Sequence, residues 1–238
     1  MTRFAVPVVA LILLEIFVDA RFIPTPSVVA IGAFELVRSG ELWRHLALTL
    51  SRTLAGFTIA SVVGIAFGLW LGYERTVQPY FMPTIEVFRA IPGVALLPLA
   101  VLWFGLGSSS QIPVIAFAAT FPVLLNAMRG AEELPRVLVR AAEVMELDPS
   151  RLLRHVLIPA SLPYIFTGLR LSIVYALTSG VGAEIIAGTD GLGFLVLDYQ
   201  RTLMPDKMFA TMILVAISGL LMSLALRRAE EYFLSYRL

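Results

Sequence analysis

Long apolar segments alternate with shorter polar segments along most of this 238-residue chain. A helix needs about 20 predominantly apolar residues to cross the hydrocarbon core of a bilayer. Six segments reach or approach that length, and they predict six transmembrane helices. Their ranges are 4–18 (completed by 19–23), 46–72, 83–105, 112–128, 163–186 and 208–226.

The composition agrees with this pattern. Hydrophobic residues make up 58% of the chain and charged residues 15%, whereas a soluble domain is roughly 25% charged. We therefore expect an all-α, polytopic membrane protein with a single transmembrane domain over residues 1–238. The first apolar segment resembles a signal peptide. Glu15 and Asp19, however, stand where a small-residue cleavage site would lie, which favours an uncleaved first helix.

Proline and polar residues predict how the helices are connected. The segment Pro24–Ser27 breaks the chain after the first helix. Residues 28–37 then fit either an amphipathic helix that lies at the membrane interface or a simple external loop. We expect a tight outer turn at 108–111 and an outer loop at 188–206.

Two of the predicted helices carry small residues at every fourth position. This spacing lines one helix face, and helices in lipid associate through close backbone approach along such faces. We expect these residues to pack against neighbouring helices rather than to bind a ligand. The positions are Gly56, Ala60, Gly64 and Gly68 in the second predicted helix, and Gly168, Ser172, Ala176 and Gly180 in the fifth.

The longest polar segment, 129–162, separates the fourth and fifth predicted helices. We expect two short helices there, with a bend near Glu146–Asp148. Asp148 followed by Pro149 is typical of a helix start, since a carboxylate caps the first turn and proline suits the first helical position. Pro159 and Pro163 are expected to end that helix. The segment either docks a partner or is an ordinary cytoplasmic linker.

The distribution of basic residues favours one orientation in the membrane. With the N-terminus inside, ten of the eighteen Lys and Arg residues fall in cytoplasmic segments, five outside and three within helices. By the positive-inside rule, both termini and the segment 129–162 are then cytoplasmic. The cytoplasmic set is Arg3, Arg75, Arg129, Arg136, Arg140, Arg151, Arg154, Arg227, Arg228 and Arg237.

The polar segment resembles the EAA loop of ABC importer permeases. That pattern is Glu-Ala-Ala, three residues, glycine, nine residues, and then an aliphatic, any residue, an aliphatic and proline. Here Arg140 replaces the acid and Glu146 the glycine, while the alanines, the spacing and the final proline remain. The resemblance implies that this loop seats a helix in a groove of an ATPase subunit. The residues it implicates in coupling are Arg140, Ala141, Ala142, Glu143, Glu146, Val156, Ile158 and Pro159.

Three further phrases are similar to the nitrate, sulfonate, taurine and bicarbonate branch of that family: Arg-Ala-Ile-Pro at 89–92, Trp-Phe-Gly-Leu-Gly at 103–107 and Gly-Leu-Gly at 191–193. The resemblance implies a type I importer fold in the inner (plasma) membrane. It also implies a second permease copy, forming a homodimer, two ATP-binding cassette subunits and a periplasmic or lipid-anchored solute-binding protein. A small anion is the expected solute; some relatives carry pyrimidine or flavin precursors or aromatic acids.

Motifs for nucleotide binding and common catalysis are absent from the sequence. There is no P-loop, no His-Glu-x-x-His and no Gly-x-Ser-x-Gly. The chain has no cysteine, and its two histidines, His45 and His155, are far apart, so we expect no metal site. No basic run indicates nucleic-acid binding. We expect that the chain is not an enzyme and has no cofactor of its own, and that a partner ATPase binds ATP and Mg²⁺. A gradient-driven secondary transporter and a membrane-embedded enzyme are the alternatives.

Three polar residues within predicted helices are candidates for the translocation pathway, because such groups usually face a cavity or a partner. Glu184 lies towards the outer end of the fifth helix, and we expect it near the gate or the dimer contact; a satisfied structural carboxylate is the alternative. Arg89 and Asn126 are the other candidates. Glu86, three residues before Arg89, lies on the same helix face and can neutralise it.

Overall fold

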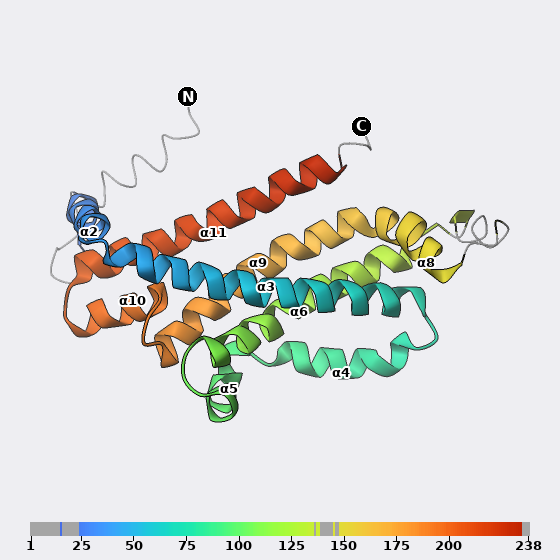
Figure 1. Ribbon diagram of the computed structural model, residues 1–238, viewed down its shortest axis with the longest axis horizontal. Coiled ribbons are helices and arrows are strands. Elements are labelled where there is room, and N and C mark those ends of the chain that lie inside the picture. Colours follow the sequence, from blue (N-terminus) through green and yellow to red (C-terminus); the bar gives the residue numbers. More distant parts are fainter. Residues whose placement is uncertain (1–14, 16–23, 136, 139–144, 146–147, 235–238) are drawn as a thin grey trace. The chain divides into compact units, whose positions relative to one another are not determined.

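The computed structural model describes residue 15 and residues 24–135, 137–138, 145 and 148–234. Every regular element in these ranges is a helix (Figure 1), as the all-α expectation required. The first predicted span, 4–18, lies outside the described residues apart from Glu15.

Four helical stretches in the described ranges are long and apolar enough to cross a membrane, and a bent pair counts as a fifth. They correspond to the second to sixth predicted helices. The four are α3 (Glu41–Tyr73), α6 (Ser108–Glu132), the stretch Ser150–Ala187 that contains α9 (Ile158–Ala187), and α11 (Pro205–Leu234); the pair is α4 (Gln78–Ala90) with η2 (Gly93–Leu96) and α5 (Leu97–Phe104).

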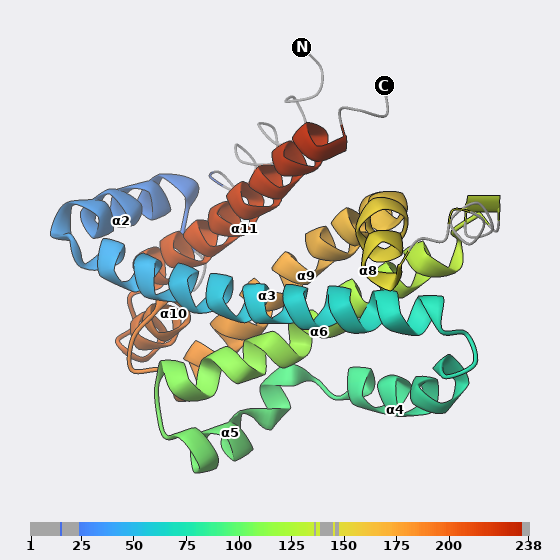
Figure 2. The ribbon, with the colours of Figure 1, turned by 45° about the vertical axis from the view of Figure 1, so that its right-hand side comes forward.

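The third predicted helix is broken, where the sequence predicted a continuous span. The stretch after α4 continues at an angle of 85°, which Figure 2 shows as a sharp change of direction. Ile91 and Pro92 are extended, with ψ of 120° and 122°, and proline favours that conformation in the residue before it. A Cβ atom on Gly93 would lie 2.7 Å from the Cβ of Ala118. Glycine therefore allows the break to approach α6 closely.

Pro159 and Pro163 do not end the helix, contrary to expectation. The short helix α8 (Pro149–Leu152) passes through a π-helical turn, η3 (Leu153–Leu157), directly into α9. Proline cannot donate the usual backbone hydrogen bond. The π turn immediately before Pro159 changes the hydrogen-bond register there, so the chain accommodates the ring and stays helical.

Three other connections are more helical than the alternating pattern predicts. Residues 108–111 form the first turn of α6 rather than an outer turn, and the predicted outer loop contains α10 (Leu192–Arg201). Residues 26–39 form α2 (Pro26–Ser39), so the helix, and not the simple loop, is correct. Its position at the membrane interface stays a prediction.

The residues group into two compact units. The first comprises Met1–Leu50 and Val181–Ser218, and the second comprises Ser51–Gly180 and Gly219–Leu238. In the first unit, α2, α10 and the adjoining ends of α3 and α11 share one apolar core. Its buried members are Val29, Leu36, Leu42, Leu192, Leu195, Tyr199 and Ala210.

In the second unit, α6 packs against both α3 and α9 at their small residues. A Cβ atom on Gly64 would lie 2.9 Å from the Cβ of Val123, and the Ser172 hydroxyl donates to the carbonyl oxygen of Ala119 at 2.7 Å. Larger side chains would separate these backbones. The small residues that contact α6 or are buried beside it are Gly56, Ala60, Gly64, Gly68, Gly168, Ser172, Ala176 and Gly180.

Candidate functional site

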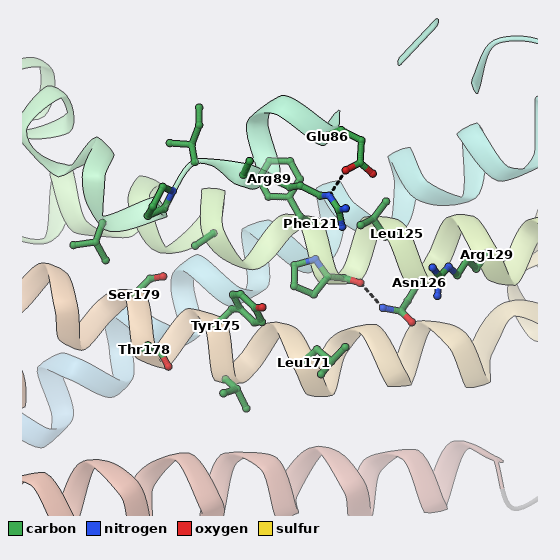
Figure 3. Close-up of a pocket in the computed structure, with 18 residues that line it drawn as sticks. Glu86, Arg89, Phe121, Leu125, Asn126, Arg129, Leu171, Tyr175, Thr178 and Ser179 are labelled. Carbon is green, nitrogen blue, oxygen red and sulfur yellow. Dashed lines mark hydrogen bonds and ion pairs between the residues drawn. The ribbon is translucent and has the colours of Figure 1, made fainter. Parts of the chain in front are cut away.

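A cavity of about 910 Å³ lies within the second unit. Side chains from α4, from the break after it, and from α6 and α9 line it (Figure 3). Irregular backbone at membrane depth is tolerated where protein buries it or where it lines a water-filled cavity. The break between α4 and η2 fits that rule, since Ile91, Pro92 and Gly93 all line the cavity.

The Arg89 and Glu86 side chains form an ion pair on the cavity wall, as their spacing predicts. Arg89 Nε lies 2.5 Å from Glu86 Oε2, and both side chains are about half exposed. Asn126, on α6, donates from Nδ2 to the carbonyl oxygen of Pro122 at 2.8 Å. Figure 3 shows both interactions beside the same space. The structure therefore brings two of the three pathway candidates together.

Arg129 also lines the cavity. From the sequence it was identified only as one of the basic residues on the cytoplasmic side. It lies on the last turn of α6 and is exposed. Among the described residues, no carboxylate forms an ion pair with its guanidinium. The ionisable side chains at the wall are thus one carboxylate, Glu86, and two guanidiniums, Arg89 and Arg129, which gives a formal charge of +1. Tyr175 and Thr178 from α9 add hydroxyl groups to the opposite wall.

Glu184, the third candidate, does not line this cavity. It lies in the first unit, 1% exposed. The Thr49 hydroxyl lies 2.9 Å from each of its carboxylate oxygens, and the backbone N–H of Gly193 donates to Oε2 at 2.9 Å. The hydrogen bonds of Glu184 are those expected of a satisfied structural carboxylate, and its position near the gate or the dimer contact stays a prediction.

Three side chains together cap the N-terminus of α10. The first N–H groups of a helix have no partner within it. Here the N–H of Gly191 donates to Nδ1 of His45 at 2.9 Å, that of Leu192 to the Thr49 hydroxyl at 2.8 Å, and that of Gly193 to Glu184. A carboxylate at this end also complements the helix dipole. The backbone of Gly191, Leu192 and Gly193 therefore donates to two side chains more than 140 residues away, those of His45 and Thr49, and to Glu184, nine residues before Gly193.

Only part of the predicted coupling segment is described. Arg140, Ala141, Ala142, Glu143 and Glu146 lie outside the described residues. The start at Asp148 is confirmed, because its Oδ1 accepts the Arg151 N–H at 2.7 Å. Val156 and Ile158 pack against a buried cluster that includes Leu69, Ala131 and Ile165, so the end of the motif rests on α3, α6 and α9, and Pro159 follows in the first turn of α9.

A hydrogen bond joins the start of the polar segment to α9, the helix that follows it. The Tyr164 hydroxyl donates to Glu133 Oε2 at 2.8 Å. Glu132, the residue before it and the last of α6, accepts from the side chain of Gln78 at 2.5 Å. Both carboxylates at the end of α6 therefore have partners of their own. In the part of the chain that the structure describes, no cluster of three His, Cys, Asp or Glu residues could hold a metal ion.

Residues 60–234 match the family model described as the inner membrane component of binding-protein-dependent transport systems. The chain belongs to this family. Membership of this family implies that a separate subunit hydrolyses ATP and that a solute-binding protein is a partner. The permease is accordingly a multi-pass membrane protein.

Curated relatives cover most of this permease. It is 33% identical over 220 residues to the putative aliphatic sulfonates transport permease SsuC of Bacillus subtilis, with 92% of this chain and 80% of that protein covered. It is 36% identical over 219 residues to the taurine transport system permease TauC of Escherichia coli, with 90% and 80% covered. A bicarbonate permease of Synechococcus elongatus is 34% identical over 184 residues, covering 76% of this chain and 66% of that protein.

The fold is also that of a solved importer. A chain of the MetNI methionine ABC transporter, in an inward-facing conformation, superposes with a TM-score of 0.72 at 20% identity. The match covers 81% of this permease and 95% of that chain. The type I importer fold expected from the resemblance is therefore confirmed.

Proposed function

We propose that this permease passes a small anion, with an alkanesulfonate as the first candidate and the sulfonate-bearing zwitterion taurine as the second, from a solute-binding protein to the cytoplasm. The observation that carries the proposal is the cavity beside the broken helix α4–α5, whose wall has a formal charge of +1. Relatives named for sulfonates and taurine support the same class of solute. A riboflavin permease of Chloroflexus aurantiacus, 34% identical over 177 residues, defines the main competing solute.

The energy for transport comes from a separate ATPase that binds the segment 129–162 on the cytoplasmic side. The fixed ends of that segment support this assignment, since the Tyr164–Glu133 bond and the buried Val156 and Ile158 tie it to the spanning helices. Closure of two ATPases on bound ATP then moves the helices as rigid levers and opens the pathway to the other side. Both termini of the permease lie in the cytoplasm.

A second copy of the permease completes the pathway. The cavity is lined by α4, α6 and α9, and three large apolar side chains of α9 among its lining, Leu171, Val174 and Tyr175, are about half exposed. A surface of this kind, next to a charged cavity, suits a symmetric partner better than lipid. Two copies around one axis give the closed pathway that a single copy lacks.

Uptake by reconstituted vesicles tests the proposal. Proteoliposomes that contain the permease with its ATPase should accumulate radiolabelled ethanesulfonate or taurine only when ATP and the solute-binding protein are both supplied. Dissipating the proton and sodium gradients should leave uptake unchanged. Uptake that follows an ion gradient without ATP, or riboflavin uptake without any sulfonate uptake, would overturn it.

The coupling assignment has its own test. Ala142→Pro should prevent co-purification of the ATPase with the permease, while the matched change Ala142→Ser should preserve it. An ATPase that stays bound to the proline variant would place its docking surface elsewhere.

A further inference from the structure

We propose that Arg129 is the anion-contacting residue of the cavity, and that it stays available because Glu86 and Glu133, the carboxylates that could pair with it, are each bound by another side chain. The inference rests on the proposed function, in which this cavity belongs to the pathway. It assigns to Arg129 the recognition of a small monoanion such as an alkanesulfonate, and it assigns to Tyr164 a positioning role at a distance from the anion.

The first observation is the difference between the two cavity guanidiniums. Arg89 is neutralised by Glu86 at 2.5 Å, so the pair presents little net charge to a solute. Arg129, on α6, lines the same cavity, is exposed, and has no carboxylate partner among the described residues. A guanidinium offers a planar set of donors that matches the oxygens of a carboxylate, phosphate or sulfonate.

The second observation explains why Arg129 stays available. Glu133 follows it by four residues, the spacing at which a helical Arg and Glu pair. The Tyr164 hydroxyl from α9 instead binds Glu133 Oε2 at 2.8 Å. Glu132 is engaged by Gln78 in the same way. Two carboxylates that could neutralise Arg129 are thus both held by other side chains.

The third consideration is the strength of binding that a pathway needs. A solute must bind well enough to enter and weakly enough to leave. One exposed guanidinium provides that weak attraction, whereas two adjacent free guanidiniums would hold an anion longer. Glu86 therefore limits the affinity of the cavity for an anion by pairing with Arg89. Arg129 gives the cavity its preference for a negatively charged solute.

The absence of cysteine from the chain makes the charge at this site measurable. Asn126→Cys places one thiol in the cavity, three residues before Arg129 on α6. The purified permease is treated with two methanethiosulfonates of similar size, one carrying a sulfonate and one an ammonium group. The ratio of their rates reports the local potential, and it cancels any change in thiol reactivity that affects both reagents equally.

The proposal predicts the direction of each change in that ratio. Adding Arg129→Gln should lower the sulfonate-to-ammonium ratio about 3-fold or more, the size expected for removing one charge within several ångströms in a watery cavity. Glu86→Gln should raise it by a similar factor. Tyr164→Phe should lower it, because Glu133 is then free to pair with Arg129. Arg228→Gln, an exposed arginine that does not line the cavity, is the matched control and should leave it unchanged.

Protection by the anion completes the experiment. Sodium ethanesulfonate should slow modification of the cavity thiol by the neutral reagent methyl methanethiosulfonate more than sodium gluconate does at equal ionic strength, and Arg129→Gln should abolish the difference. An unchanged rate ratio in Arg129→Gln, or equal protection by both salts, would overturn the inference. Because these measurements need neither ATP nor transport, their failure is separate from failure of the uptake assay.

Discussion

The hydroxyl of Thr49 lies 2.9 Å from both carboxylate oxygens of Glu184, and the same oxygen of Thr49 accepts the N–H of Leu192 at 2.8 Å. One side chain from α3 thus joins a buried carboxylate on α9 to the first turn of α10. Because Thr49 and Glu184 are 135 residues apart, the contact closes a long segment of the chain. It holds the start of α10 in place by polar contacts rather than by packing alone.

Glu184→Gln should destabilise the protein more than it alters transport by the folded molecules. The amide has one acceptor where the carboxylate has two, and hydrogen bonds to a charged group contribute about 1.5–3 kcal/mol each. The melting temperature in detergent should fall, while uptake per folded molecule stays close to that of the wild type. The sequence-based hypothesis of a gate predicts the reverse, normal melting with impaired uptake. Glu231→Gln, on exposed α11 surface, is the control.

Gly191→Ala should cost much more stability than Gly40→Ala. Both glycines have positive φ, 104° and 79°, so alanine is strained at each, at a cost of about 1 kcal/mol. A Cβ on Gly40 meets nothing within 4 Å, whereas one on Gly191 would lie 2.2 Å from the carboxyl carbon of Glu184. The melting temperatures of the two variants separate the clash from the strain. Equal losses would contradict the position assigned to Glu184.

Leu203→Gly should stabilise the turn between α10 and α11. Leu203 has a φ of 56°, and the Met204 N–H bonds the Tyr199 carbonyl at 2.9 Å in the pattern that usually ends a helix with glycine. The leucine side chain is 86% exposed, so little packing is lost on its removal. The expected gain is about 1 kcal/mol, seen as a higher melting temperature. Leu203→Ala keeps the strain and should show no comparable gain.

Stability should fall steeply between about pH 10 and 12 because of Tyr199. Burial, with the nearby carboxylates of Glu41, Asp198 and Asp206, raises the pKa of Tyr199 from 10.0 to about 12. The folded state therefore keeps the phenol protonated at pH values where the unfolded chain has lost the proton. That stabilisation is complete below pH 10 and is lost as the pH rises through 12, in all about 2–3 kcal/mol.

Tyr199→Phe should flatten this pH dependence, measured as melting temperature against pH. The matched change Tyr80→Phe removes a phenol that is 83% exposed and should leave the profile as in the wild type. A profile that Tyr199→Phe does not alter would mean that another group titrates.

Hydropathy predicts the spans because the bilayer fixes the length of an apolar helix. Contacts between residues three apart can also be predicted from the sequence. Asp148 caps the turn that contains Arg151, and Glu86 pairs with Arg89. The break in the third helix was not predicted, because a proline such as Pro92 also occurs in continuous transmembrane helices. That the chain turns there depends on the close approach of Gly93 to Ala118 on another helix.

The candidate site was predicted in part for the same reason. Glu184 stood out as an ionisable group in a span, but its partner Thr49 is 135 residues away, and its contact with Gly193 spans a turn whose course the sequence does not give. Arg129 was counted only as a cytoplasmic charge, since nothing local indicates that Tyr164 holds the carboxylate of Glu133 away from it. Long-range polar contacts thus separate Glu184, which is buried among hydrogen-bond partners, from Arg129, which is exposed and lines the cavity.

Blocking the cavity shows whether the solute passes through it. The permease with Asn126→Cys, reconstituted with its ATPase and solute-binding protein, is fully modified by the sulfonate-bearing methanethiosulfonate, and ATP-driven uptake of ethanesulfonate is measured before and after release of the adduct with dithiothreitol. The account predicts that modification stops uptake, that dithiothreitol restores it, and that the cysteine-free wild type is insensitive throughout. Undiminished uptake by the fully modified protein would contradict a pathway through this cavity.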